Sequence, residues 1–190
     1  MFTDLEKEIL RRSWGQIVPL ADGWVDAFYK RLFELRPEYR TLFPLDMSGQ
    51  KRRFVRFAAF VVKSLDFAGS DWRISVDPRE DLLLVLLALG RRHAEFRRVP
   101  PDAYGPFGDA LIQAFLQVLG DQFSPEAQTL WERLYAALAL AMRLGPFTVD
   151  EQADSVSAEE AQQLGEQAFF AQMAGSSSLE ARLDLAQGPL

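Results

Sequence analysis

The chain contains a single histidine, His93, and no cysteine. A neutral imidazole is a good metal ligand, but a zinc site needs three or four protein ligands. One histidine without any thiolate therefore excludes a multi-histidine metal site, a disulfide framework and a cysteine nucleophile within one chain. A lone histidine on an apolar stripe is most often a core residue, so a ligand role for His93 needs support from the residues around it.

Two other polar side chains stand in apolar surroundings. Tyr29 lies on a strongly apolar segment with Trp24, Phe28 and Phe33, and its hydroxyl needs a hydrogen-bond partner there. Gln50 stands at the start of an aromatic stretch that continues to about residue 65. Each is most simply a structural or boundary residue when taken alone. Together they indicate a functional role if a cavity beside them holds a ligand that accepts hydrogen bonds.

The elements that must position these residues are helices, because apolar residues recur at helical spacing and no segment shows a convincing strand alternation. Thr3 and Glu6 form a capping box that begins the first helix. We expect Pro19 to be the first residue of a second helix. Pro37 and Pro44 bracket a short turn-like segment.

The second half of the chain continues the helical pattern. A helix over about 49–65 and a loop over 67–76 lead to a helix that begins at Asp77-Pro78 and carries His93. Pro100-Pro101 interrupts the chain, Ser124 begins the last long helix, and Gly145-Pro146 ends it. One stripe of the histidine helix, at offsets of four, three, four and three, is formed by Leu82, Leu86, Leu89, His93 and Phe96.

The composition indicates a soluble globular protein with an acidic end. Apolar residues make up 48% of the 190 residues and the formal net charge is -6. Of the 27 acidic and 21 basic residues, eight acidic ones and a single arginine follow residue 149, so the body is close to neutral. We find neither the basic stripe that nucleic-acid binding requires nor a signal peptide or membrane span, and we expect a cytoplasmic protein.

In their order, four stretches resemble the haem globins, in particular the globin part of bacterial flavohaemoglobins and single-domain bacterial haemoglobins. They are FYKRLFELRPEYRTLFP, LGRRHAEF, PDAYGPFGDALI and the tryptophan–tyrosine pair of LWERLYAAL. The resemblance covers about Leu5 to Leu144. It implies an all-α, globin-like fold over residues 1–146, followed by an acidic C-terminal extension over 147–190, partly helical or flexible.

The resemblance also implies a haem b (iron protoporphyrin IX) site. His93 matches the proximal iron ligand, with Leu89 and Tyr104 beside it. Phe43 matches the phenylalanine that packs on the porphyrin. The remaining matches are Tyr29 and Gln50 as distal hydrogen-bond donors, Phe54 as the apolar residue over the iron, and Arg53 as a residue able to reach a haem propionate.

Two departures from the family pattern bear on function. Flavohaemoglobins carry a glutamate late in the last globin helix that pairs with the proximal tyrosine and histidine, whereas this region reads Met142-Arg143-Leu144. A peroxidase-like electron push from the histidine is therefore in doubt. The flavin and nicotinamide reductase domain is also missing from this sequence, and no glycine-rich nucleotide loop is present.

The preferred function is reversible binding of O2, and of CO and NO, at a pocket formed by Tyr29 and Gln50. One alternative is nitric oxide dioxygenation with a separate reductase, which would use the same pocket. Another is a haem-based gas sensor or homo-oligomer that acts through the extension, where an amphipathic helix beginning near Ser157 would present Leu164, Phe169 and Met173. Whether the protein is an enzyme stays open at this point.

Overall fold

The computed structural model describes residues 2–65, 82–95 and 97–147. Throughout these ranges every regular element is helical, which confirms the all-α expectation. The expected loop over 67–76, the Asp77-Pro78 helix start, Phe96 and nearly all of the acidic extension lie outside the described residues. The elements are α1 (Asp4–Ile17), η1 (Val18–Leu20), α2 (Ala21–Leu35), η2 (Pro37–Leu42), α3 (Ser48–Ser64), α4 (Leu82–Glu95), η4 (Pro101–Ala103), α5 (Tyr104–Leu119), η5 (Gly120–Gln122), α6 (Pro125–Leu144) and η6 (Gly145–Phe147).

Local sequence signals set several helix ends. The Thr3 hydroxyl accepts from the Glu6 N–H while the Glu6 carboxylate accepts from the Thr3 N–H, so the predicted capping box is confirmed. The Ser124 side chain likewise caps α6 by accepting from Ala127. The expectation for Pro19 was wrong: it lies inside the 3-10 turn η1, and α2 begins at Ala21. Its fixed φ suits the first turn of a 3-10 helix as well as that of an α-helix.

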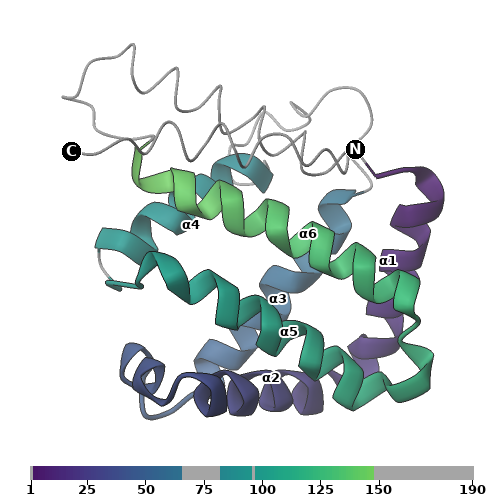
Figure 1. Cartoon of the computed structure of the whole chain (residues 1–190), viewed down its shortest axis with the longest axis horizontal. Coiled ribbons are helices and arrows are strands. Elements are labelled where there is room, and N and C mark those ends of the chain that lie inside the picture. Colours follow the sequence, from purple (N-terminus) through teal and green to yellow (C-terminus); the bar gives the residue numbers. More distant parts are fainter. Residues whose placement is uncertain (1, 66–81, 96, 148–190) are drawn as a thin grey trace.

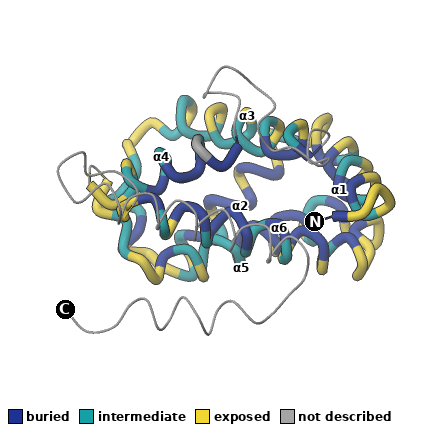
Figure 2. The backbone as a smooth tube through the Cα atoms, turned by 90° about the horizontal axis from the view of Figure 1, so that it is seen from above, coloured by how far each residue is buried: buried dark blue, intermediate teal, exposed yellow. Residues whose placement is uncertain are grey.

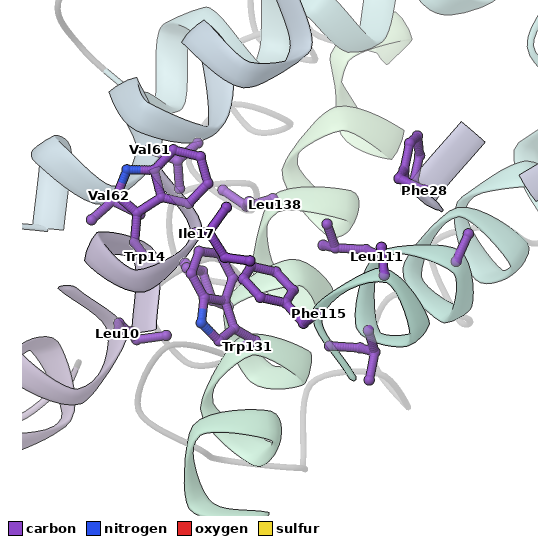
Figure 3. Packing of buried hydrophobic residues seen from close by; sticks show 14 of the residues in the cluster. Leu10, Trp14, Ile17, Phe28, Val61, Val62, Leu111, Phe115, Trp131 and Leu138 are labelled. Carbon is purple, nitrogen blue, oxygen red and sulfur yellow. The ribbon is translucent and has the colours of Figure 1, made fainter. Parts of the chain in front are cut away.

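The helices surround a core that is rich in large aromatic rings. Contacts between α2 and α5 are the most extensive, followed by those between α4 and α6. Figure 3 shows the Trp131 ring beside Phe115, and their centroids are 4.5 Å apart. The Trp131 indole N–H donates to the buried Ser13 hydroxyl at 2.8 Å, which joins α6 to α1. The core therefore holds the helices from both ends of the described chain together.

The arrangement in space leaves the histidine helix against the last helix. In Figure 1, α6 crosses in front of α4 near the C-terminal end of α6, while α5 and α2 lie below. Seen from above, α3 and α4 run along one side of the molecule and α5 and α6 along the other (Figure 2). The candidate residues are thus spread over four helices, with Tyr29 on α2, Gln50 on α3, His93 on α4 and Tyr104 on α5.

Two glycines allow α4 to approach α6 closely. A Cβ at Gly90 would overlap the backbone carbonyl of Met142, and one at Gly145 would overlap the carbonyl of Leu87. These are backbone atoms, so no side chain can rotate to make room. His93 follows Gly90 by one turn of α4. The position of the only imidazole is thus set by a backbone-to-backbone crossing.

The end of α4 is also fixed. The Val99 N–H donates to the His93 carbonyl at 3.0 Å, and Arg98 adopts a φ of 50°. This is the left-handed turn that often ends a helix, here without the usual glycine. Within residues 2–65, 82–95 and 97–147, no helix combines the length and the apolar character that crossing a bilayer requires.

Candidate functional site

His93 presents a neutral imidazole on the inner side of α4. Burial lowers its pKa, and the positive charges of Arg97 and Arg92 lower it further. Its Nδ1 lies 3.5 Å from the Tyr104 hydroxyl, at the long end of the hydrogen-bond range. Among the described residues no hydrogen bond reaches Nε2, and in the tautomer that carries its hydrogen on Nδ1, donating toward Tyr104, the lone pair of Nε2 is open to another partner.

Tyr104 is itself positioned by a second tyrosine. The Tyr135 hydroxyl donates to the Tyr104 backbone carbonyl at 2.6 Å. A Cβ at Gly108 would lie 2.6 Å from the Tyr135 ring, so the glycine makes room for that ring between α5 and α6. Burial raises the pKa of both phenols, while the charge of Arg143 partly lowers that of Tyr104. Both hydroxyls therefore stay protonated at neutral pH.

A second polar group lies on α2 and α3. Tyr29 is 3% exposed, and its oxygen accepts from the Gln50 amide nitrogen at 3.2 Å. Burial raises the pKa of Tyr29 to about 12, despite the hydrogen bond from Gln50 and the charge of Arg53, which lower it. Tyr29 is therefore a neutral hydrogen-bond donor over the physiological range.

Two side chains of the first turn of α3 contact α2, and an arginine of the same helix binds one of them. Arg53 Nη2 donates to Gln50 Oε1 at 3.0 Å. Lys51 Nζ lies 2.6 Å from the Asp26 carboxylate on α2. The first turn of α3 is thus tied to α2 at two places, through Lys51 and through Gln50.

Aromatic rings pack around the ring of Tyr29. The ring of Phe43 lies 5.4 Å from that of Tyr29, and the ring of Phe54 lies 6.1 Å from it. Phe54 also packs against Phe28 and Phe107, with centroids 4.6 and 5.5 Å away. These rings reduce access of water to the phenol, which strengthens any hydrogen bond that it makes.

The described contacts divide the expected site residues into two groups. We call Tyr29, Phe43, Gln50, Arg53 and Phe54 the distal cluster, since contacts link all five. We call His93, Tyr104 and Tyr135 the proximal cluster. Leu89 is a half-buried side chain on α4, one turn before His93. Within the described ranges no hydrogen bond, ion pair or aromatic ring contact joins His93 to the distal cluster.

This arrangement fits a flat apolar group between the clusters. Several apolar side chains that face the core are only half-buried, which is the expected state of walls that enclose a ligand: Leu42, Phe43, Met47, Phe54, Phe57, Leu89, Tyr104 and Phe107. Among the described residues no three acidic, histidine or cysteine side chains gather to hold a bare metal ion. An iron that arrives with its own ring ligands needs only one further nitrogen, a role that the chemistry of the His93 imidazole suits.

Sequence reasoning missed residues whose importance comes from a crossing of helices. The sequence showed Tyr135 only as part of the tryptophan–tyrosine pair of LWERLYAAL, and it did not predict that the Tyr135 hydroxyl donates to the Tyr104 carbonyl. Phe107 contacts Phe54 on one side and Tyr135 on the other, and it was assigned no role in the site. The glycine at position 90, just before the histidine turn, was the one available signal of a close helix crossing.

An open groove of about 930 Å³ lies elsewhere, between the outer sides of α5 and α6. Tyr104, Tyr135 and Arg143 contribute to its lining, but neither His93 nor any member of the distal cluster does. The groove therefore borders the proximal cluster from behind and is separate from the candidate ligand space.

Comparisons with known proteins agree with this geometry. Residues 26–142 match the globin family. The chain is 27% identical to a flavohemoprotein of Rhizobium meliloti over 139 residues, which cover 73% of this chain and 32% of that protein. It is 29% identical to hemoglobin subunit beta-2 of Xenopus tropicalis over 150 residues, covering 77% of this chain and 98% of that protein. A neuroglobin of Dissostichus mawsoni is 26% identical over 150 residues, covering 75% and 91%.

The chain spans about a third of the length of the Rhizobium flavohemoprotein and nearly all of the vertebrate hemoglobin subunit. The matched region includes both polar clusters and leaves out α1, η1, the first residues of α2, the end of α6 and η6. On the family match, the helical architecture and the lone imidazole beside an apolar space, this chain belongs to the globin family.

Proposed function

We propose that this protein holds haem b through His93 Nε2 and binds a diatomic gas, preferably O2, reversibly on the side of the distal cluster. When bound, the haem supplies an iron atom that coordinates such a gas. The observation that carries the proposal is the Tyr29–Gln50 pair, whose phenol is buried among phenylalanines and which is separate from the His93–Tyr104 pair.

The distal cluster favours ligands that gain negative charge. A hydrogen bond to a charged partner contributes about 1.5–3 kcal/mol. Because about 1.4 kcal/mol corresponds to a factor of ten, one such bond from Tyr29 slows O2 release roughly ten- to hundredfold. CO gains much less charge and benefits less. The rings of Phe28, Phe43 and Phe54 keep water away from the same place.

The proximal cluster favours a binding protein over a peroxidase-like one. An acid paired with the proximal tyrosine and histidine would make the imidazole a stronger electron donor. Here the charge that acts on Tyr104 is that of Arg143, and those that act on His93 are Arg97 and Arg92, all positive. These positive charges therefore make the His93 imidazole a weaker electron donor.

The second candidate function is nitric oxide dioxygenation, in which O2 and nitric oxide combine to give nitrate. The similarity to flavohemoproteins favours it, and the same Tyr29–Gln50 pair would serve it. The match covers 32% of that relative, and for this second function we propose a reductase as the partner that supplies electrons. We propose residues 1–146 as the ligand-binding unit and 147–190 as an acidic extension.

Absorption spectra and rapid kinetics test the proposal. We expect the purified protein to show a haem spectrum that shifts with CO in the reduced state, and a His93→Ala variant to lose it. A Tyr29→Phe variant should release O2 about ten- to hundredfold faster with a much smaller change for CO. Tyr39→Phe is the matched control, since Tyr39 is a buried tyrosine of η2 outside both clusters.

Two outcomes would contradict the proposal. If His93→Ala retained an unchanged nitrogen-ligated spectrum, His93 would not be the ligand. If Tyr29→Phe released O2 at the wild-type rate, Tyr29 would not be the residue that donates a hydrogen bond to the ligand. Sustained consumption of nitric oxide with a cellular reductase would select the second function over the first.

A further inference from the structure

Arg53 makes a contact that differs from the propionate contact expected for it. Its Nη2 donates to Gln50 Oε1 at 3.0 Å, and Gln50 Nε2 donates in turn to the Tyr29 oxygen at 3.2 Å. The three side chains form one chain of hydrogen bonds that runs from an exposed guanidinium on α3 to a buried phenol on α2.

The direction of these hydrogen bonds follows from the chemistry of the groups. A guanidinium has only donors, so the amide atom that faces Arg53 must be the carbonyl oxygen. The NH2 group of Gln50 then faces Tyr29 and must donate to its oxygen. Since the phenol already accepts at that point, its own hydrogen has to point elsewhere and is left available to a ligand.

The opposite orientation of the amide would have the opposite effect. With the Gln50 oxygen turned toward Tyr29, the phenol would donate to the amide, and its hydrogen would be lost to a ligand. The NH2 group would then face the guanidinium, donor against donor. Arg53 therefore disfavours the orientation in which Tyr29 is occupied by Gln50.

We propose that Arg53 is a positioning residue that fixes the Gln50 amide so that Tyr29 presents its hydroxyl hydrogen to the gas ligand. This inference rests on the proposed function and adds a determinant of ligand selectivity to it. Arg53 thereby favours ligands that gain negative charge, such as O2, over CO. It acts through Gln50 and needs no contact of its own with the ligand.

The backbone of α3 does not depend on Arg53 for its position. The Lys51–Asp26 ion pair, at 2.6 Å, ties the same turn of α3 to α2. Phe54 packs on Phe28 and anchors the next residue along the chain. A substitution at the exposed Arg53 is therefore expected to change the orientation of the amide while the fold persists.

The test compares variants of the haem-loaded protein. Arg53→Met keeps much of the aliphatic length and removes the donors, and Arg53→Lys keeps the charge without the planar fork. Arg56→Met, an exposed arginine one turn further along α3, is the matched control. The readouts are the O2 and CO dissociation rates, the C–O stretching frequency of the CO complex, and the rate of haem loss.

We expect Arg53→Met to release O2 about three- to tenfold faster, as for the loss of one hydrogen bond, with the CO rate changed less than twofold. The C–O stretching band should move to higher frequency or split in two, because both amide orientations become populated. Arg53→Lys should restore part of the wild-type behaviour, and Arg56→Met should match the wild type. In a Gln50→Leu background, Arg53→Met should add nothing further.

Three results would overturn the inference. Unchanged O2 release and an unchanged C–O band in Arg53→Met would show that the amide is oriented without the guanidinium. An equal effect of Arg53→Met in the Gln50→Leu background would show that Arg53 acts directly. Faster haem loss with unaltered gas kinetics would assign Arg53 to a propionate. All three leave the Tyr29→Phe result intact, which tests the proposed function separately.

Discussion

Gly90 is the position at which a single methyl group should disturb both the fold and the site. A Cβ there would lie 2.7 Å from the Met142 Cα and would overlap the adjoining carbonyl. Ordinary carbon contacts are about 3.5–4 Å. The Gly90→Ala variant must therefore separate α4 from α6 by roughly 1 Å, and His93 moves with α4 because it follows one turn later.

The size of the effect can be worked out from two opposing contributions. Alanine is preferred over glycine inside a helix by about 1 kcal/mol. Overpacking against a rigid neighbour costs about 1–3 kcal/mol, and sometimes more. Because the obstructing Met142 atoms are backbone, we expect the upper part of that cost, about 2–3 kcal/mol, so that Gly90→Ala lowers the free energy of unfolding by about 1–2 kcal/mol net and accelerates haem loss through displacement of the imidazole.

Gly15→Ala is the matched control. Gly15 also lies inside a helix, α1, but a Cβ there meets nothing within 4 Å. This variant should gain up to about 1 kcal/mol from helix propensity alone and keep the wild-type rate of haem loss. Urea unfolding and haem transfer to an acceptor protein measure the two quantities. Equal stability and equal haem loss for both alanine variants would refute the claim that the α4–α6 crossing positions His93.

The other predictions concern the core and the N-terminal cap. Ser13→Ala leaves the buried Trp131 N–H without its acceptor and should lower the free energy of unfolding by about 1–3 kcal/mol in urea, whereas Ser64→Ala, whose hydroxyl bonds only within its own helix, should cost less. For Glu6, burial raises the pKa but hydrogen bonds from Thr3 and Arg133 lower it more, so the net shift is downward. A lowered pKa means that the carboxylate stabilises the fold above its unfolded-state pKa of about 4.5, and that this stabilisation is lost as the pH falls through the folded-state value. Glu6→Gln should therefore weaken the protein at pH 7 by less than about 1 kcal/mol and flatten the acid side of its stability profile, as followed by urea unfolding at a series of pH values.

The sequence allowed prediction of features that depend on neighbouring residues. The capping box at Thr3 and the cap at Ser124 are set within three or four residues, so both were correctly placed. Pro19 was assigned to the wrong kind of turn, because a fixed φ does not distinguish α from 3-10 geometry. The residues of the distal cluster came from a family resemblance, and their shared contacts became visible only when α2 and α3 were placed side by side.

Features that depend on how helices cross could not be read from the sequence. Gly90 and Met142 are distant along the chain, and no local pattern shows that their backbones touch. The contact of Arg53 with Gln50 is local, but it competes with solvent and with a propionate contact, so spacing alone did not decide it. Phe107 and Tyr135 lie on different helices, and their stacking depends on the gap that Gly108 provides.

One row of aromatic side chains has a consequence for how variants of this protein should be interpreted. Phe54 touches Phe107, Phe107 stacks on Tyr135 at 6.0 Å, and the Tyr135 hydroxyl holds the backbone of Tyr104 beside His93. Residues in contact rarely have additive effects. The distal and proximal clusters are therefore coupled through packing. Truncation of the Phe54 side chain is expected to change the orientation of the His93 imidazole as well as the space available to the gas ligand.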